Sequence, residues 1–212
     1  EAILLCGAVG MGKSRFLEAL AVTLKDSQCV RIPCCERQVI FSLAKQMQNV
    51  KARPEHEIFQ RWLTGKVKDP PSAIGPEEMA RGVTAVLRDQ VATLAAQKPT
   101  VVLCDDVDLG DHLIRLVIRQ LSAEAVTLGI LMLMTSRPLA TTPPGMTRVD
   151  LEPLSAETAL ELIKHLGATP EAVKPFLSVA AGIPQALVQI AKASLEGLLP
   201  KDAVAAGADF LR

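Results

Sequence analysis

The segment GAVGMGKS, residues 7–14, directly follows the short apolar run AILLC at residues 2–6. It matches the pattern G-x-x-x-x-G-K-[ST], with Gly7, Gly12, Lys13 and Ser14 in the fixed positions. Glycines permit the backbone angles and the close approach by which main-chain N–H groups surround a phosphate chain. This segment therefore predicts a strand, then a phosphate-binding loop, then a helix that begins at the loop.

The residues after the loop support this prediction, because apolar side chains recur there at helical spacing: Phe16, Leu17, Leu20, Ala21 and Leu24. The strand, loop and helix context disfavours the alternative, a glycine turn with an unrelated lysine. Lys13 would reach the β- and γ-phosphates of a nucleotide, and the Ser14 hydroxyl would bind Mg²⁺. The residues predicted to bind the nucleotide here are Gly7, Val9, Gly10, Met11, Gly12, Lys13, Ser14 and Arg15.

Four further apolar runs predict strands of the same sheet: CVRIP at 29–33, TVVLC at 100–104, GILMLMTS at 129–136 and TRVDL at 147–151. Most are apolar at nearly every position, as parallel strands covered on both faces should be. Helical patterns lie between them, most clearly at 77–97. We therefore predict an α/β fold of the P-loop NTPase type, with a mostly parallel sheet sandwiched by helices.

The pattern changes after about residue 153, where no further strand is predicted. A helix is expected from Ser155, a plausible N-cap, to a stop at Gly167, and two more helical segments follow, each closed by a glycine. The expected organisation is a nucleotide-binding α/β core over 1–152 and a small all-helical lid over 153–212.

Two acids end the predicted strand in VVLCDDVD, residues 101–108. At the end of a strand near a phosphate loop, Asp105 would hold Mg²⁺, directly or through water, and Asp106 would orient or deprotonate the attacking water. An apolar strand followed by aspartates is a weak signal alone, since strand ends are often polar. The phosphate loop upstream makes the metal-site interpretation the stronger one.

A third polar strand end occurs in LMLMTSRP, residues 131–138. Ligands bind at the carboxyl ends of strands in open α/β sheets, so Thr135, Ser136 and Arg137 are expected at the same edge as the loop and the acids. Ser136 would help to bind the nucleotide, and Arg137 would contact the γ-phosphate and sense its loss. The alternative is a surface arginine that caps the strand.

Composition limits the other possibilities. Lys+Arg and Asp+Glu both number 23, and the zero net charge argues against a nucleic-acid footprint over the whole chain. No run of eighteen apolar residues predicts a membrane span, and no signal peptide is visible, so we expect a cytoplasmic protein. Because the chain begins at Glu1 immediately before a strand, we expect it to be part of a longer protein.

Five cysteines raise the question of a metal site. Cys6 and Cys104 end apolar strands and are expected to be buried thiols. Cys29, Cys34 and Cys35 cluster at the second predicted strand, but a zinc site would need a fourth ligand at a suitable spacing, and His56 does not provide one. Reduced cysteines are the simpler interpretation.

Taken in order, these motifs resemble the AAA+-related signal-transduction ATPases of the STAND class. The segments that carry the resemblance are GAVGMGKS, VVLCDDVD, LMLMTSRP, LEPLSAETALELI and GIPQAL, and within the class the chain looks closest to the MalT-like and Orc-like ATPase modules of bacterial regulators. GIPQAL, residues 182–187, matches the GxP motif of the class, which implies that Pro184 packs near the adenine or its phosphates.

The resemblance implies an ATP/ADP switch with Mg²⁺ that gates assembly or a fused effector, with protein partners or self-assembly through flanking regions. The adenine-contacting segment of such proteins precedes the first strand and lies outside this chain. GIPQALVQIA lacks the sensor arginine of AAA+ motors, so a slow ATPase switch fits better than a motor. Arg115 and Arg119, in DHLIRLVIRQL, are candidate arginine fingers across a subunit boundary, with solvated helix-face residues as the alternative.

Three other functions remain open. An Orc-like ATPase acting on nucleic acid would need a basic appendage, which this neutral chain does not show. A module that binds nucleotide without catalysis would not need Lys13, Ser14, Asp105 and Asp106 together. A small-molecule kinase would need an arginine-bearing lid, and the loop at 138–146 contains no arginine.

Overall fold

The computed structural model describes residues 1–34, 53–69, 71 and 74–199. These residues form two compact units. The first comprises Glu1–Cys6 and Lys13–Asp150, and the second comprises Gly7–Gly12 together with the residues from Leu151 onward. The phosphate-loop segment therefore groups with the C-terminal helices, although its two ends continue into the first unit.

A five-stranded parallel sheet forms the centre of the first unit, with the strand order β2-β3-β4-β1-β5. The strands are β1 (Ala2–Cys6), β2 (Gln28–Pro33), β3 (Thr100–Asp105), β4 (Leu131–Ser136) and β5 (Thr147–Asp150). All five correspond to apolar runs predicted to be strands. The parallel arrangement requires a crossover between consecutive paired strands, and helices supply most of these connections.

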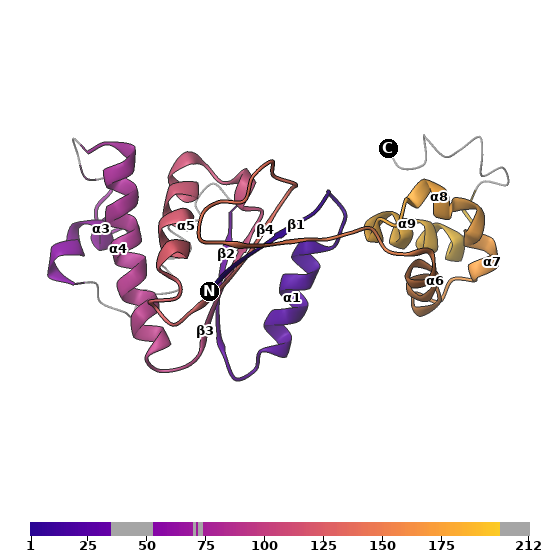
Figure 1. Cartoon of the computed structure of the whole chain (residues 1–212), viewed down its shortest axis with the longest axis horizontal. Coiled ribbons are helices and arrows are strands. Elements are labelled where there is room, and N and C mark those ends of the chain that lie inside the picture. The colour runs from indigo at the N-terminus through magenta and orange to yellow at the C-terminus, as the bar shows by residue number, and fades with distance from the viewer. Residues whose placement is uncertain (35–52, 70, 72–73, 200–212) are drawn as a thin grey trace. The chain divides into compact units, whose positions relative to one another are not determined.

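Helices cover both faces of this sheet (Figure 1). On one face lies α1 (Lys13–Thr23), and on the other lie α4 (Pro76–Ala95) and α5 (His112–Glu124). The predicted helix at 77–97 is α4. Two shorter helical segments, η1 (Pro54–His56) and α3 (Glu57–Leu63), pack beside α4, and η2 (Val107–Leu109) follows β3.

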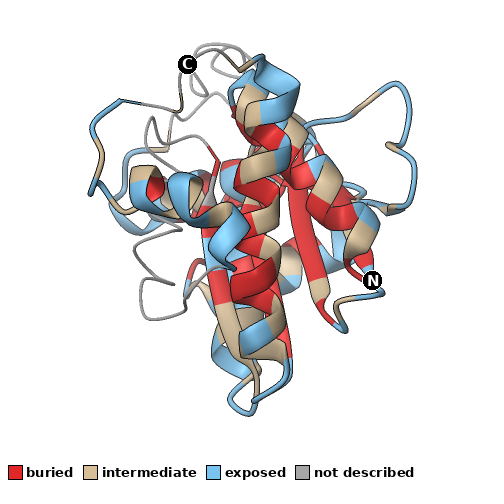
Figure 2. Ribbon diagram, turned by 90° about the vertical axis from the view of Figure 1, so that its left-hand side faces the viewer, coloured by how far each residue is buried: buried red, intermediate tan, exposed pale blue. Residues whose placement is uncertain are grey.

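The main core lies between the sheet and the pair α4 and α5. Its fully buried members include Leu4, Leu87, Leu121, Met132 and Met134. The buried residues run along the central strands and the inward faces of the helices (Figure 2). On the opposite face, Leu17 of α1 is buried, whereas Phe16 is 47% exposed, so the apolar stripe expected for α1 is narrower than its sequence indicates.

The second unit contains the short helices α6 (Ala156–His165), α7 (Pro170–Val173), η3 (Lys174–Phe176), α8 (Leu177–Ala180) and α9 (Pro184–Leu195). Ile163, Val173, Leu187 and Ile190 are fully buried in its own core. Ser155 caps α6 as predicted, because its side chain accepts a hydrogen bond from the Thr158 N–H.

Two glycines of the second unit have left-handed backbone conformations but different surroundings. Gly167, at φ +84°, has no atom within 4 Å of the position that a Cβ would take. Gly182, at φ +71°, would place a Cβ 2.5 Å from the carbonyl oxygen of Leu154. The Gly182 carbonyl also accepts a hydrogen bond from the Leu154 N–H at 2.9 Å, which holds the two backbones together.

We expect Gly182→Ala to destabilise the protein by about 1–3 kcal/mol more than Gly167→Ala. Both variants place a side chain in the left-handed region, which costs roughly 1–2 kcal/mol, but only Gly182→Ala also forces two backbones apart. Urea denaturation followed by circular dichroism measures both free energies of unfolding. Equal losses of unfolding free energy in the two variants would show that the close approach of the backbones at Gly182 does not affect stability.

Candidate functional site

The polar ends of three strands meet at one edge of the sheet. In the register of the sheet, Cys6 of β1 pairs with Ser136 of β4, and Cys104 of β3 pairs with Met134 of β4. Because β4 lies between β1 and β3, Thr135 is adjacent to the acids that end β3. The loop Gly7–Gly12 begins directly after Cys6. The predicted convergence of strand ends is thus present in the first unit.

The loop Gly7–Gly12 has the glycine-dependent conformation that a phosphate loop requires. Gly10 and Gly12 both have φ +85°, which side-chain-bearing residues rarely adopt. Val9 is 71% exposed, whereas Met11 is buried. Gly7 has no such backbone requirement, but a Cβ there would lie 3.2 Å from that of Leu151.

Within the second unit, the loop is joined to the start of α9 by a main-chain hydrogen bond. The Gln185 N–H donates to the Gly10 carbonyl oxygen at 3.1 Å. A Cβ on Gly10 would lie 3.0 Å from atoms of both Ile183 and Gln185, so the contact is close. Pro184, predicted to pack near the nucleotide, is the first residue of α9. The predicted residues Gly10 and Pro184 therefore belong to neighbouring segments of one unit.

The helix α1 begins at the two residues expected to contact phosphate and metal. Lys13 is its first residue and is 7% exposed, which is unusually low for a lysine. Ser14 follows and is exposed. Arg15, also predicted to contact the nucleotide, has a highly exposed side chain that pairs with Glu18 at 2.8 Å.

Ser14 and Asp105 line the same cavity of about 280 Å³ in the first unit. The other described residues that line it are Leu17, Glu18, Arg31, Ile32 and Leu103. A serine hydroxyl and a carboxylate are hard oxygen ligands of the kind that Mg²⁺ binds, usually with several retained waters. The two predicted metal ligands thus have the chemistry and the shared cavity that a magnesium site needs.

The ends of β3 and β4 are connected through the buried hydroxyl of Thr135. This hydroxyl donates to Asp105 Oδ1 and accepts a hydrogen bond from the Asp106 N–H at 2.8 Å. Thr135 is fully buried, so the network is held inside the sheet edge. The sequence pattern predicts Thr135 at this edge but indicates no role for it, since nothing in the pattern distinguishes this hydroxyl from that of Ser136.

Asp106 is strained and electrostatically perturbed. Its backbone lies in the left-handed region at φ 52° and ψ 53°, which aspartate tolerates better than most residues. Burial raises the pKa of its carboxyl, and the neighbouring Asp105 raises it further, against the lowering effect of Lys13. Both features are common at functional sites.

Arg137, predicted to sense the γ-phosphate, is paired with Asp108. Its Nε donates to Asp108 Oδ2 at 2.5 Å, and its backbone N–H donates to Oδ1 at 3.2 Å. Burial tends to raise the pKa of Asp108, but the hydrogen bonds from Arg137 outweigh it and lower the pKa. Ser136 is fully buried, and its hydroxyl donates to the Arg137 carbonyl oxygen at 2.8 Å.

The remaining candidates lie apart from this edge or carry no sign of a site. Arg115 and Arg119 are exposed on α5. Cys6 and Cys104 are fully buried, as predicted, and hydrogen bonding with Cys34 together with burial raises the pKa of the Cys104 thiol. Cys35 lies outside the described residues. Among those described, no three histidine, cysteine or acidic residues are grouped as metal ligands would be.

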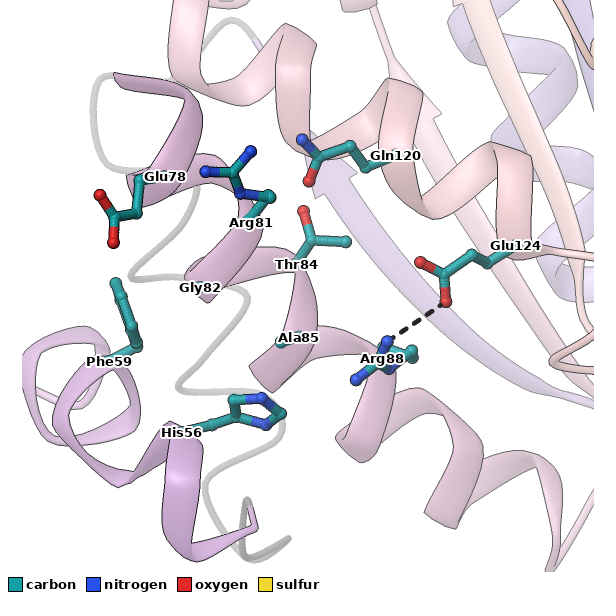
Figure 3. Close-up of a pocket in the computed structure, with 10 residues that line it drawn as sticks. All are labelled: His56, Phe59, Glu78, Arg81, Gly82, Thr84, Ala85, Arg88, Gln120 and Glu124. Atoms are coloured by element: carbon teal, nitrogen blue, oxygen red, sulfur yellow. Dashed lines mark ion pairs between the residues drawn. The ribbon is translucent and has the colours of Figure 1, made fainter. Parts of the chain in front are cut away.

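A second cavity, of about 610 Å³, is lined by helical residues of the first unit and not by strand ends (Figure 3). Phe59 lies against Gly82, and Arg88 pairs with Glu124 at 3.6 Å across one side. None of the residues predicted to bind nucleotide or metal is among the described residues that line it. The described residues that line this second cavity are His56, Phe59, Glu78, Arg81, Gly82, Thr84, Ala85, Arg88, Gln120 and Glu124.

The raised pKa of Asp106 predicts a stability gain when its charge is removed. A raised folded-state pKa contributes stability below the ordinary carboxyl pKa, and this contribution is lost as the pH rises through the raised value. We therefore expect Asp106→Asn to be more stable than the unmodified protein at neutral pH. The difference should shrink as the pH is lowered through about 4, because below the ordinary carboxyl pKa the group becomes protonated in both states. Urea denaturation across this pH range measures it.

Asparagine suits this comparison because it tolerates the left-handed backbone as well as aspartate does. Asp26→Asn, which removes one carboxylate from an exposed turn, controls for the change in net charge. An equal gain for Asp26→Asn, or none for Asp106→Asn, would contradict the local electrostatic explanation.

No described helix is both long enough and apolar enough to cross a membrane.

No curated protein matches the sequence of this chain. Among solved structures, a STAND protein (signal transduction ATPase with numerous domains) with a tetratricopeptide repeat sensor from Pyrococcus horikoshii is 16% identical, with a TM-score of 0.55 over 91% of this chain and 28% of that one. A Walker-type ATPase of Pyrococcus abyssi is 16% identical, with a TM-score of 0.57 over 99% of this chain and 66% of that one.

Identities this low establish a shared fold and nothing more. This chain spans 28% and 66% of those two proteins, so it corresponds to only part of each. A protein-family model described as an AAA ATPase domain matches residues 1–139, which is more than half of the chain. The parallel sheet, its flanking helices and the glycine loop after β1 agree with this match. The chain therefore belongs to the family of AAA ATPase domains.

Proposed function

We propose that this chain is the nucleotide-binding module of a larger regulatory protein, in which bound ATP or ADP sets the state of the helical unit. The observation that carries the proposal is the hydrogen bond from the Gln185 N–H to the Gly10 carbonyl. A phosphate chain that contacts the loop thereby acts on a segment joined directly to α9. Hydrolysis is expected to be slow, so that each nucleotide state lasts long enough to signal.

The individual roles follow from the chemistry of each residue. The loop Gly7–Gly12 and Lys13 would bind the phosphates, and Ser14 and Asp105 would hold Mg²⁺. When bound, Mg²⁺ supplies charge neutralisation at the phosphate oxygens. Asp106 would orient the attacking water, and its raised pKa favours acceptance of a proton from that water. Ser136 would support the backbone at Arg137.

The similarity to a solved structure of a signal-transduction ATPase supports the proposed regulatory role. The similar protein from Pyrococcus horikoshii is a signal-transduction ATPase that carries a repeat sensor, and this chain corresponds to 28% of it. By analogy, the present module would act with a sensor or effector, or with further copies of itself, through other parts of its protein. Mass measurement of the full-length protein with ADP and with a non-hydrolysable ATP analogue tests whether assembly follows the nucleotide.

Lys13→Ala tests nucleotide binding. The variant removes a cation at the start of α1, and losing a charge-assisted contact there should weaken the binding of ATP roughly a hundredfold or more. Equilibrium titration with a fluorescent ATP analogue measures the affinity, with the exposed Lys25→Ala as a control for charge. Unchanged affinity in Lys13→Ala, or no binding by the unmodified protein, would refute the phosphate-loop assignment.

Arg137→Ala tests the switch. Only ATP presents a γ-phosphate, so the variant should bind ADP normally and lose roughly tenfold or more of its preference for ATP. Calorimetric titration with both nucleotides, beside the exposed Arg61→Ala as the matched control, gives the ratio. An ATP-to-ADP affinity ratio equal to that of the unmodified protein would leave Arg137 as a surface cap of β4.

A further inference from the structure

Asp108 holds Arg137 by one edge of its guanidinium group. The carboxylate accepts from Nε through Oδ2 and from the Arg137 backbone N–H through Oδ1. The two partners differ in exposure, since the side chain of Asp108 is 13% exposed and that of Arg137 is 53% exposed. The carboxylate is therefore the fixed partner, and the arginine extends from it toward solvent.

The contact leaves the other edges of the guanidinium group available. Arginine has five N–H donors in one plane, and Asp108 takes only the one on Nε. No described residue accepts a hydrogen bond from Nη1 or Nη2 of Arg137. A carboxylate bound across both Nη groups would compete with a phosphate. A carboxylate on Nε instead fixes the plane of the guanidinium group and leaves four N–H donors for an anion.

Asp108 lies in a turn that is held in place by a hydrogen bond and by close packing. Asp106 redirects the backbone in the left-handed region, and its N–H is anchored to the Thr135 hydroxyl at 2.8 Å. The turn η2 then carries Asp108 back to the end of β4. Gly110 closes the turn where a Cβ would lie 2.8 Å from the side chain of Ile114. The same turn thus sets the positions of Asp106 and Asp108.

We propose that Asp108 is a positioning residue that holds Arg137 ready for the terminal phosphate and so increases the preference of the site for ATP over ADP. This inference rests on the proposed function above, in which Arg137 contacts the γ-phosphate. Without Asp108, the long arginine side chain samples several rotamers, and the binding free energy of ATP is then reduced by the entropy lost on ordering it. ADP lacks the terminal phosphate, so its affinity does not depend on that ordering.

The test measures ATP and ADP affinities of Asp108→Ala and Asp108→Asn by calorimetry. Asp108→Ala is expected to weaken ATP binding roughly tenfold while ADP binding changes by less than about twofold. Asp108→Asn keeps an oxygen acceptor without the charge and should fall between Asp108→Ala and the unmodified protein. Glu124→Gln, which alters another arginine-paired carboxylate of the first unit, is the matched control and should leave the ratio unchanged.

A double-mutant cycle separates positioning of Arg137 from a general structural effect. If Asp108 acts through Arg137, then Asp108→Ala should not change the ATP-to-ADP ratio further in an Arg137→Ala background. A further fall there would overturn the proposal, as would an unchanged ratio in both single Asp108 variants. A ratio that rises on removal of Asp108 would show that the pair blocks the phosphate.

Two further outcomes are distinguishable. Failure of the unmodified protein to bind either nucleotide refutes the proposed function and, with it, this dependent inference. Binding with an intact preference for ATP in both Asp108 variants refutes only the inference. Thermal unfolding of each variant identifies any loss of fold, and Asp108→Asn, the smaller change, decides the question if Asp108→Ala does not fold.

Discussion

Parallel pairing of β4 with both β1 and β3 is the constraint on which the rest of the first unit depends. It turns the carboxyl ends of three strands toward the same edge, and it requires crossovers that cover the sheet with helices. The strand interiors must then be apolar on both faces, so polar groups gather where the strands end. Thr135, Ser136 and the acids after Cys104 occupy those positions for this reason.

The same constraint explains what could be predicted from the sequence. A strand covered on both faces is apolar at nearly every position, so β1, β3 and β4 are recognisable on that ground, and the residues after them are natural candidates for the site. The edge strand β5 is mostly exposed, so this reason does not extend to it. The short helix α3 left no comparable signal, because its seven residues bury only Leu63. The positions of Asp105 and Arg137 followed from the strands, but their hydrogen-bond partners did not.

Those partners depend on a local backbone choice that no periodicity encodes. The pairing of Asp108 with Arg137 requires the left-handed turn at Asp106, and the bridge through Thr135 requires two strands that are far apart in the chain. The sequence pattern likewise gives no signal that the loop Gly7–Gly12 groups with the C-terminal helices. That grouping includes the hydrogen bond between Gly10 and Gln185, which are separated by about 175 residues of chain. Strained backbone is common at functional sites, and the left-handed turn at Asp106 lies at the proposed site.

The hydrogen bond between Gly10 and Gln185 has a consequence for how such modules diverge. Both of its atoms belong to the main chain, and it satisfies an N–H in the first turn of α9 that has no partner within the helix. Residue 185 can therefore be substituted without loss of this hydrogen bond, except by proline, which has no backbone N–H to donate. Comparison of side chains alone would not reveal such a link in a related protein, because both of its atoms belong to the main chain.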